Sequence, residues 1–112
     1  HLYQPLHPAV LRSIRRTVEC AQAAGRWAGV CGEMAGDPLT AVLLVGLGVD
    51  ELSVSCYDLP RVKAAIRAVR WSDARALAER VLSLGSAEAV EQALRSWGEE
   101  RLPATMHGRN RS

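Results

Sequence analysis

The sequence contains no phenylalanine, and three tryptophans and two tyrosines supply all of its aromatic side chains. Hydrophobic residues make up 48% of the chain, and they are mainly alanine, leucine and valine. Alanine and leucine are strong helix formers. The 112 residues are enough for one domain of ordinary size. The composition therefore predicts a helix-rich fold with a core of aliphatic side chains.

Cysteine is also scarce. The three cysteines, Cys20, Cys31 and Cys56, are odd in number, and no two of them have the spacing of a CxxC motif. This argues against a disulfide framework and against a zinc site. We therefore expect reduced thiols, a cytoplasmic location and no metal-binding set in this chain.

Long apolar runs and a large charge of one sign are missing as well. The apolar run from Ala41 to Val49 is too short to span a bilayer and contains two glycines. The formal net charge of +2 is too small to indicate a nucleic acid or an anionic membrane as partner. The sequence therefore predicts neither a membrane protein nor a nucleic-acid-binding protein.

Hydrophobic periodicity and turn residues divide the chain into helices and two short strands. We expect helices at residues 9–24, 38–47, 60–69, 73–84 and 87–98, and strands at 27–31 and 51–55. Residues 99–112 show no pattern and are predicted to be a disordered tail.

Several residues mark the expected helix ends. Gly25 is the natural stop of the first helix. Asp37 followed by Pro38 is a paired start signal, and Ser72 and Ser86 are expected caps of the last two helices. The helix that starts at Pro38 is apolar almost all round, so more than one neighbour must bury it.

The segment 27–55 has the order strand, helix, strand. Both strands are short, and the first is nearly all apolar, which is typical of parallel strands buried on both faces. A strand–helix–strand unit of this kind places its two strands parallel.

Cys31 closes the first expected strand, and a turn from Gly32 to Gly36 leads into the next helix. Ligands of α/β proteins bind at the carboxyl ends of parallel strands. Judged by the residues alone, Cys31 is either a functional thiol or a small buried hydrophobe. Cys56 follows the second strand at the same end, and Cys20 fits a structural position on a helix.

The run Gly29-Val-Cys-Gly-Glu-Met-Ala-Gly-Asp37 resembles the reactive-cysteine segment of enzyme I of the bacterial sugar phosphotransferase system, a phosphoenolpyruvate–protein phosphotransferase. The flanks resemble it too: Leu2-Tyr-Gln-Pro5, the run from Leu47 to Ser55, and Pro60-Arg-Val-Lys63. The resemblance covers residues 2–97. The cysteine motif is shared with pyruvate phosphate dikinase, and the helical extension from Trp71 to Trp97 favours enzyme I.

The resemblance implies an α/β fold: residues 1–98 would be the last two strands of a partial (β/α)₈ TIM barrel, with extra carboxyl-terminal helices. It implies phosphoenolpyruvate (PEP) and Mg²⁺ as ligands and phosphoryl transfer to a protein histidine and a histidine-containing carrier protein. Cys31 would protonate enolpyruvate to give pyruvate. Gly32, Glu33, Gly36 and Asp37 would shape its loop.

The family's phosphate-binding arginines, Mg²⁺ carboxylates and phosphorylated histidine have no counterpart in the sequence. His1, His7 and His107 all lack the context of a phosphorylated histidine. The resemblance therefore implies a fragment that is inactive without the missing amino-terminal part, and a parent that forms a homodimer. We also expect strands and helix 38–47 to lose neighbours, so that the isolated chain aggregates, self-associates or repacks.

Two non-catalytic interpretations stay open. The chain could be a truncated remnant or an interaction module that docks through the amphipathic helices 73–84 and 87–98. Arg12, Arg15 and Arg16 could form a phosphate or nucleic-acid patch, but no aromatic residue lies between them, and a solvated helix face explains them more simply.

Overall fold

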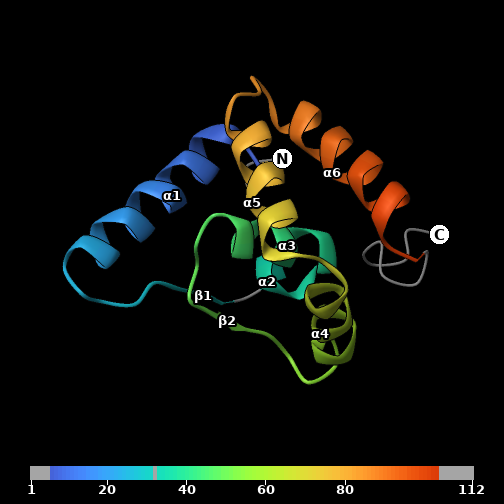
Figure 1. The fold of residues 1–112 in the computed structure, drawn as a ribbon, viewed down its shortest axis with the longest axis horizontal. Helices are drawn as coiled ribbons and strands as arrows, with labels where there is room; N and C mark the ends of the chain where they lie inside the picture. The colour runs from blue at the N-terminus through green and yellow to red at the C-terminus, as the bar shows by residue number, and fades with distance from the viewer. Residues whose placement is uncertain (1–5, 32, 104–112) are drawn as a thin grey trace.

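The structure, a computed structural model, describes residues 6–31 and 33–103, and of Cys31 and Glu33 it describes the backbone alone. Six helices and two short strands follow one another in this part of the chain (Figure 1). They are α1 (Pro8–Ala23), β1 (Gly29–Cys31), α2 (Glu33–Gly36), α3 (Pro38–Gly46), β2 (Glu51–Ser53), α4 (Leu59–Ala68), α5 (Trp71–Leu82) and α6 (Ala87–Arg101). The predicted helix-rich fold is confirmed.

Helix α3 is the centre of the core. It contacts α2, α4, α5 and α6, and Figure 1 shows α5 crossing over it. Each residue from Pro38 to Leu44 is buried. The predicted burial by several neighbours is confirmed. The expectation that this helix would lose neighbours in the 112-residue chain is wrong, because α5 and α6 cover it.

Gly46, at the end of α3, allows α3 and α5 to meet backbone to backbone. A Cβ at this position would overlap the carbonyl oxygen of Ala74 and lie 2.6 Å from its carbonyl carbon. The side chain of Ala78, one turn further along α5, would be 3.2 Å away. Only glycine permits this approach.

The predicted helix caps are largely confirmed. Gly25 follows α1 with φ of +70°, in the left-handed region that ends many helices. The carboxylate of Asp37 accepts a hydrogen bond from the Thr40 amide, and the hydroxyl of Ser86 accepts one from the Ala89 amide. These contacts satisfy amides that have no partner within the helix.

The two strands form a parallel sheet, as predicted, with Gly29 opposite Glu51 and Cys31 opposite Ser53. Each strand has three residues, so both are shorter than expected. Figure 1 shows them below α3, with α2 and α3 connecting the end of β1 to β2.

The prediction that the strands are buried on both faces is wrong. Along β2 and the residues after it, exposed and half-buried side chains alternate: Leu52 and Val54 pack against the core, whereas Glu51 and Ser53 are exposed. Trp27, expected within the first strand, lies before it and is 79% exposed. Helices therefore cover one face of this sheet, and the described residues leave the other face open.

The short helix α2 was not expected, since the glycines of segment 32–36 indicated a turn. Helix α5 also begins earlier than predicted. Arg70, and not Ser72, precedes its first residue, and the Arg70 carbonyl accepts hydrogen bonds from the amides of Asp73 and Ala74. Arg70 is extended, with ψ of 144°, so the change to helical geometry falls at Trp71.

The last helix is longer than predicted. Helix α6 continues to Arg101, so the predicted tail boundary at residue 99 is wrong for residues 99–101, which are helical. The reason is packing, since Leu102 is buried, 5% exposed, and the Arg101 guanidinium stacks over the Trp97 ring at 5.3 Å. The rest of the predicted tail, residues 104–112, lies outside the described residues.

Arginines of α1 connect this helix to α5. Arg12 donates a hydrogen bond to the carbonyl of Leu82 at 3.0 Å, and Arg15 forms an ion pair with Glu79 at 2.9 Å. Two of the three arginines considered as an anion-binding patch therefore have contacts within the fold. These contacts, and the buried Leu11 and Val18, hold α1 in place.

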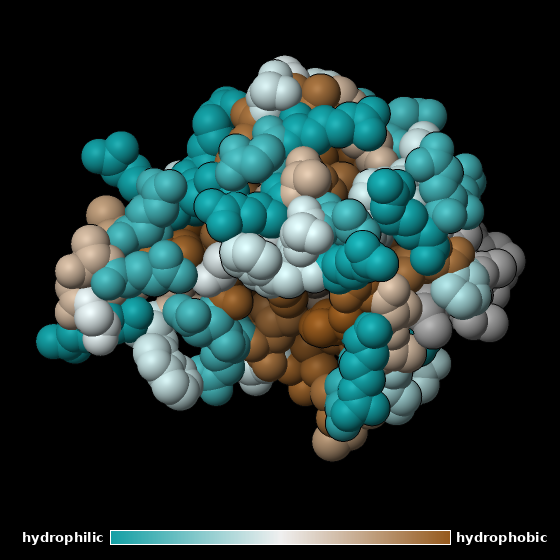
Figure 2. Space-filling view, viewed as in Figure 1, coloured by the Kyte–Doolittle hydropathy of each residue, from teal (hydrophilic) through white to brown (hydrophobic). Residues whose placement is uncertain are grey.

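The surface differs between the two halves of the view in Figure 2. Polar side chains cover most of its upper half, and apolar ones gather low in its centre, where Figure 1 shows α3, α4 and the strands. Among the described residues, no helix combines the length and the apolar character needed to cross a bilayer.

Candidate active site

The carboxyl ends of β1 and β2 lie at one edge of the sheet, because the strands are parallel and in register. β1 ends at Cys31, and β2 ends at its register partner Ser53. Gly32 lies outside the described residues, and α2 begins one residue later. The structure thus places the backbone of Cys31 at the sheet edge where the sequence predicted it, whereas its side chain is not described.

The start of α3 is held by a compact polar contact. One carboxylate oxygen of Asp37 accepts hydrogen bonds from the Thr40 amide at 3.1 Å and from the Thr40 hydroxyl at 2.8 Å. Thr40 is buried, 5% exposed. Asp37 therefore satisfies a buried hydroxyl as well as a helix amide, and it fixes the point where the cysteine-bearing segment joins α3.

The other residues predicted to shape the loop are placed only in part. Gly36 is buried and ends α2, which packs against β1, α3 and α4. Glu33 begins α2, and its side chain lies outside the described atoms, as does all of Gly32. A role of Gly32, Glu33, Gly36 and Asp37 in shaping a catalytic loop therefore stays a prediction.

Replacement of Asp37 with alanine is expected to lower the free energy of unfolding by about 1–3 kcal/mol. The variant loses a helix cap and leaves the buried Thr40 hydroxyl without its acceptor. Asp37→Asn keeps a side-chain oxygen and should cost less than half as much. Urea unfolding followed by circular dichroism measures both. Equal stability of Asp37→Ala and the parent chain would contradict the assigned contact.

A second polar cluster follows β2 at the same sheet edge. Asp58 is only 4% exposed, and its carboxylate accepts a hydrogen bond from the Ser55 hydroxyl at 3.2 Å. The Arg61 guanidinium, from the first turn of α4, lies 3.3 Å from the other carboxylate oxygen. This cluster was not predicted as part of a site, because the sequence indicated only that a helix begins at residue 60.

The open face of the sheet carries Glu51 and Ser53, both exposed. Glu51 leans across to β1: a Cβ on Gly29 would lie 3.5 Å from the Glu51 Cβ and 3.6 Å from its Oε1. The neighbouring Asp50 has a structural contact instead, since its carboxylate accepts the Ala28 amide at 3.0 Å. This face was not predicted from the sequence, because the strands were expected to be buried on both faces.

The remaining thiols and histidines have less to contribute. Cys56 is exposed beyond the end of β2, and Cys20 is exposed on α1. The His7 ring accepts the Ala9 amide through Nδ1 at 3.0 Å and so caps α1. His1 and His107 lie outside the described residues.

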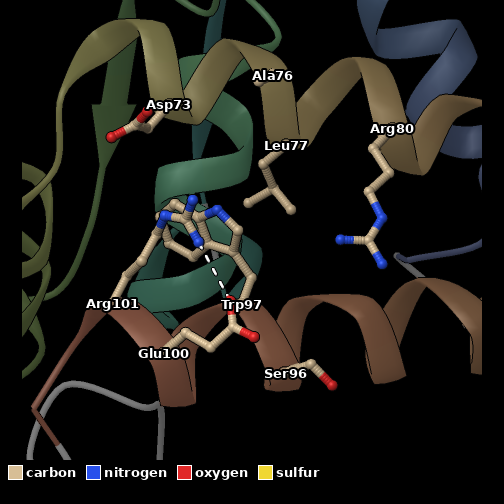
Figure 3. Close-up of a pocket in the computed structure, with 8 residues that line it drawn as sticks. All are labelled: Asp73, Ala76, Leu77, Arg80, Ser96, Trp97, Glu100 and Arg101. Carbon is tan, nitrogen blue, oxygen red and sulfur yellow. Dashed lines mark hydrogen bonds and ion pairs between the residues drawn. The ribbon is translucent and has the colours of Figure 1, made fainter.

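A groove of about 300 Å³ lies between α5 and α6, away from the strand ends (Figure 3). Leu77 and Trp97 point toward each other across it, and charged side chains line its rim. Arg101 stacks on Trp97 and lies 3.4 Å from the Glu100 carboxylate. The groove thus resembles an incompletely filled helix–helix contact.

A divalent cation needs several oxygen ligands in one place. Among the side chains that the structure describes in residues 6–31 and 33–103, which exclude those of Cys31 and Glu33, no three from His, Cys, Asp or Glu come together in such an arrangement. The described residues therefore do not fit a Mg²⁺ site of their own.

Comparison with known proteins gives consistent matches. The family described as PEP-utilising enzyme, PEP-binding domain, matches residues 1–71. The phosphoenolpyruvate-protein phosphotransferase of Haemophilus influenzae is 44% identical over 92 residues, which are 82% of this chain and 16% of that protein. The protein of the same name from Haloferax volcanii is 53% identical over 87 residues, 78% of this chain and 15% of its own length.

A third relative, the multiphosphoryl transfer protein of Xanthomonas campestris, is 53% identical over 85 residues, covering 76% of this chain and 10% of the relative. The chain thus spans about a sixth or less of the length of these relatives. The match to residues 1–71 covers more than half of the 112 residues and includes β1, α3 and β2. On this evidence the chain belongs to the PEP-utilising enzyme family.

Proposed function

We propose that this chain is the carboxyl-terminal part of a PEP–protein phosphotransferase of the enzyme I type. The complete enzyme transfers the phosphoryl group of PEP to a protein histidine and, through it, to a carrier protein. Cys31 protonates the enolpyruvate that remains. The observation that carries the proposal is the position of Cys31 at the end of β1, beside the end of the parallel strand β2, in a chain of this family.

The fold fits two successive units of a larger barrel. β1 with α3 and β2 with α4 repeat the order strand, then helix, and residues 1–98 would contribute these units together with the covering helices. The open face of the sheet, with Glu51 and Ser53, would then point toward the barrel interior. Catalytic residues of such barrels lie at the carboxyl ends of the strands, where Cys31 is.

The proposed proton transfer runs from the Cys31 thiol to a carbon atom of the substrate. Loss of the phosphoryl group leaves the enolate of pyruvate, whose methylene carbon accepts the proton of the Cys31 thiol and becomes the methyl group of pyruvate. The thiol is left as a thiolate and must regain a proton from solvent before the next turnover. A proton donor has to be protonated when the enolate arrives, so a thiol with its ordinary affinity for protons suits the step better than an activated thiolate.

Ligand binding needs residues beyond those described. Mg²⁺, when bound, would neutralise phosphate charge, but the described residues offer no set of ligands for it. In enzyme I, the PEP-binding arginines and metal carboxylates come from other parts of the protein. We therefore expect the 112-residue chain alone to release no pyruvate from PEP. The homodimeric state of the full-length parent and the cytoplasmic location stay predictions.

Mixing tests the proposal directly. The purified chain is combined with a related phosphotransferase truncated just before the segment that aligns with this chain, and pyruvate release from PEP is measured with carrier protein present. We expect activity from the mixture and none from either part. A folded pair that binds in sedimentation yet releases no pyruvate would favour the alternative, a non-catalytic interaction module.

A further inference from the structure

Basic side chains are concentrated on α4 and at the start of α5. Residues 59–72 contain one lysine, three arginines and no acidic residue, a charge of +4, whereas the whole chain carries +2, so the remaining residues sum to −2. Lys63, Arg67 and Arg70 of this segment are exposed. Lys63 and Arg67 are four residues apart and therefore lie on the same side of α4. The surface of α4 thus carries a local positive charge that the small net charge conceals.

The charges of these three side chains are not used within the described part of the fold. Arg61, the fourth basic residue of the segment, is paired with Asp58. Among the described residues, Lys63, Arg67 and Arg70 take part in no ion pair and no side-chain hydrogen bond. Their cationic groups are therefore available to a partner outside the chain.

A cavity of about 170 Å³ adjoins the start of α5, between α1 and the end of α3. It is lined by the apolar residues Val18, Leu47 and Trp71 and by Arg75. The Arg75 guanidinium stacks over the Trp71 ring at 5.1 Å. Trp71 is 59% exposed and follows Arg70 directly in the chain. The cavity and the basic segment therefore meet at Trp71.

We propose that α4 and the start of α5 form a docking surface for an acidic segment of another protein, with Trp71 and Arg75 as its anchors. Tryptophan and arginine are enriched among the residues that dominate the binding energy of protein interfaces. A guanidinium can bind a carboxylate through two parallel hydrogen bonds. The cavity beside Trp71 has room for one side chain of the acidic segment, and the exposed cations of α4 attract its other carboxylates.

An acidic protein segment fits this surface better than a lipid bilayer or a nucleic acid. From residue 63 to residue 70 the exposed side chains are three basic ones and an alanine, so no large apolar side chain is placed to enter a bilayer. The Arg75 guanidinium covers one face of the Trp71 ring, which leaves less of the ring for a stacked base.

Binding of a fluorescein-labelled deca-glutamate peptide, measured by fluorescence anisotropy at low salt, tests this surface. Each exposed ion pair changes a binding constant about 1.5- to 5-fold. Lys63→Gln combined with Arg67→Gln should therefore weaken binding about 2- to 25-fold. Trp71→Ala removes an anchor and should weaken it about tenfold or more. Glu19→Gln removes an acidic residue that lines the cavity and should strengthen binding.

Matched variants separate this surface from the net charge and from exposed tryptophan in general. Arg16→Gln combined with Arg26→Gln removes the same charge from two exposed arginines outside the surface. Trp27→Ala removes a tryptophan that is 79% exposed. Both variants should bind the peptide nearly as the parent does. Circular dichroism checks that every variant keeps its helices.

The inference would be overturned if deca-glutamate did not bind, if Trp71→Ala bound it as the parent does, or if the Arg16 and Arg26 substitutions weakened binding as much as those of Lys63 and Arg67. Tighter binding of oligothymidylate or of phosphatidylserine vesicles than of deca-glutamate would also overturn it, as would a dimer of the chain that the Lys63 and Arg67 substitutions dissociate. These measurements involve neither PEP nor pyruvate, so their outcome is independent of the role of Cys31.

Discussion

Gly46→Ala is expected to unfold the chain or to lower its free energy of unfolding by about 3 kcal/mol or more. The added Cβ would overlap the carbonyl oxygen of Ala74 and approach the Ala78 side chain. Alanine is the better helix former by about 1 kcal/mol, so propensity alone would predict stabilisation. Overpacking costs about 1–3 kcal/mol when side chains can yield, and here the obstacle is the backbone of α5 at the buried residue Ala74. The destabilisation from the steric overlap is therefore expected to exceed the gain in helix propensity.

Two other glycines provide matched controls. A Cβ on Gly85 meets nothing within 4 Å, so Gly85→Ala should change stability little. A Cβ on Gly98 would come 2.7 Å from Cδ2 of Leu39, a side-chain end that can rotate, and Gly98→Ala should lie between the two. Urea unfolding followed by circular dichroism ranks the three variants. A Gly46→Ala chain as stable as Gly85→Ala would contradict the close packing of α3 on α5.

The helices were predictable where local chemistry and burial agree. Asp37-Pro38 marks the start of α3, and the same Asp37 carboxylate caps it in the structure. An uninterrupted apolar run predicted that α3 would be buried, without indicating which helices would bury it. Gly46 could be identified as a helix end from sequence, but the close approach of Ala74 depends on tertiary packing and leaves no local signal.

The strands were less predictable because they are short. β1 has only three residues, too few for alternation to be seen, so the apolar residues near it indicated burial on both faces. Trp27 contributed most to this wrong prediction, because it was expected within the first strand but lies before it and is 79% exposed. Along Glu51 to Val54, polar and apolar residues do alternate, and that signal would have identified the open face.

The candidate site was predictable in position and not in composition. A cysteine at a strand end, followed by a glycine-rich turn and a helix start, predicted the position of Cys31 at the sheet edge, while the residues alone left open whether it is a functional thiol or a small buried hydrophobe. The pairing of Gly29 with Glu51 depends on strand register, which no local pattern determines. The burial of Asp58 depends on how α4 packs, and a single aspartate before a helix gives no sign of it.

In the reconstituted phosphotransferase, Cys31→Ala is expected to lower the rate of pyruvate release about a hundred- to ten-thousand-fold, the usual contribution of a positioned general acid. In the proposed mechanism the thiol acts only after phosphoryl transfer, so a single turnover should phosphorylate the protein histidine at close to the parental rate. The defect should therefore appear in the protonation of enolpyruvate, which is measured as pyruvate formed by each phosphorylated enzyme.

The other two cysteines serve as controls for this assignment. Cys20 and Cys56 are both exposed, so Cys20→Ser and Cys56→Ser remove a thiol with little effect on packing and should retain parental rates. Cys31→Ser tests whether the role is chemical, because a hydroxyl of similar size is a far weaker acid and should rescue little. Parental pyruvate release by Cys31→Ala would exclude Cys31 as the proton donor. Loss in the Cys56→Ser variant alone would move the role to the end of β2, across the same sheet edge.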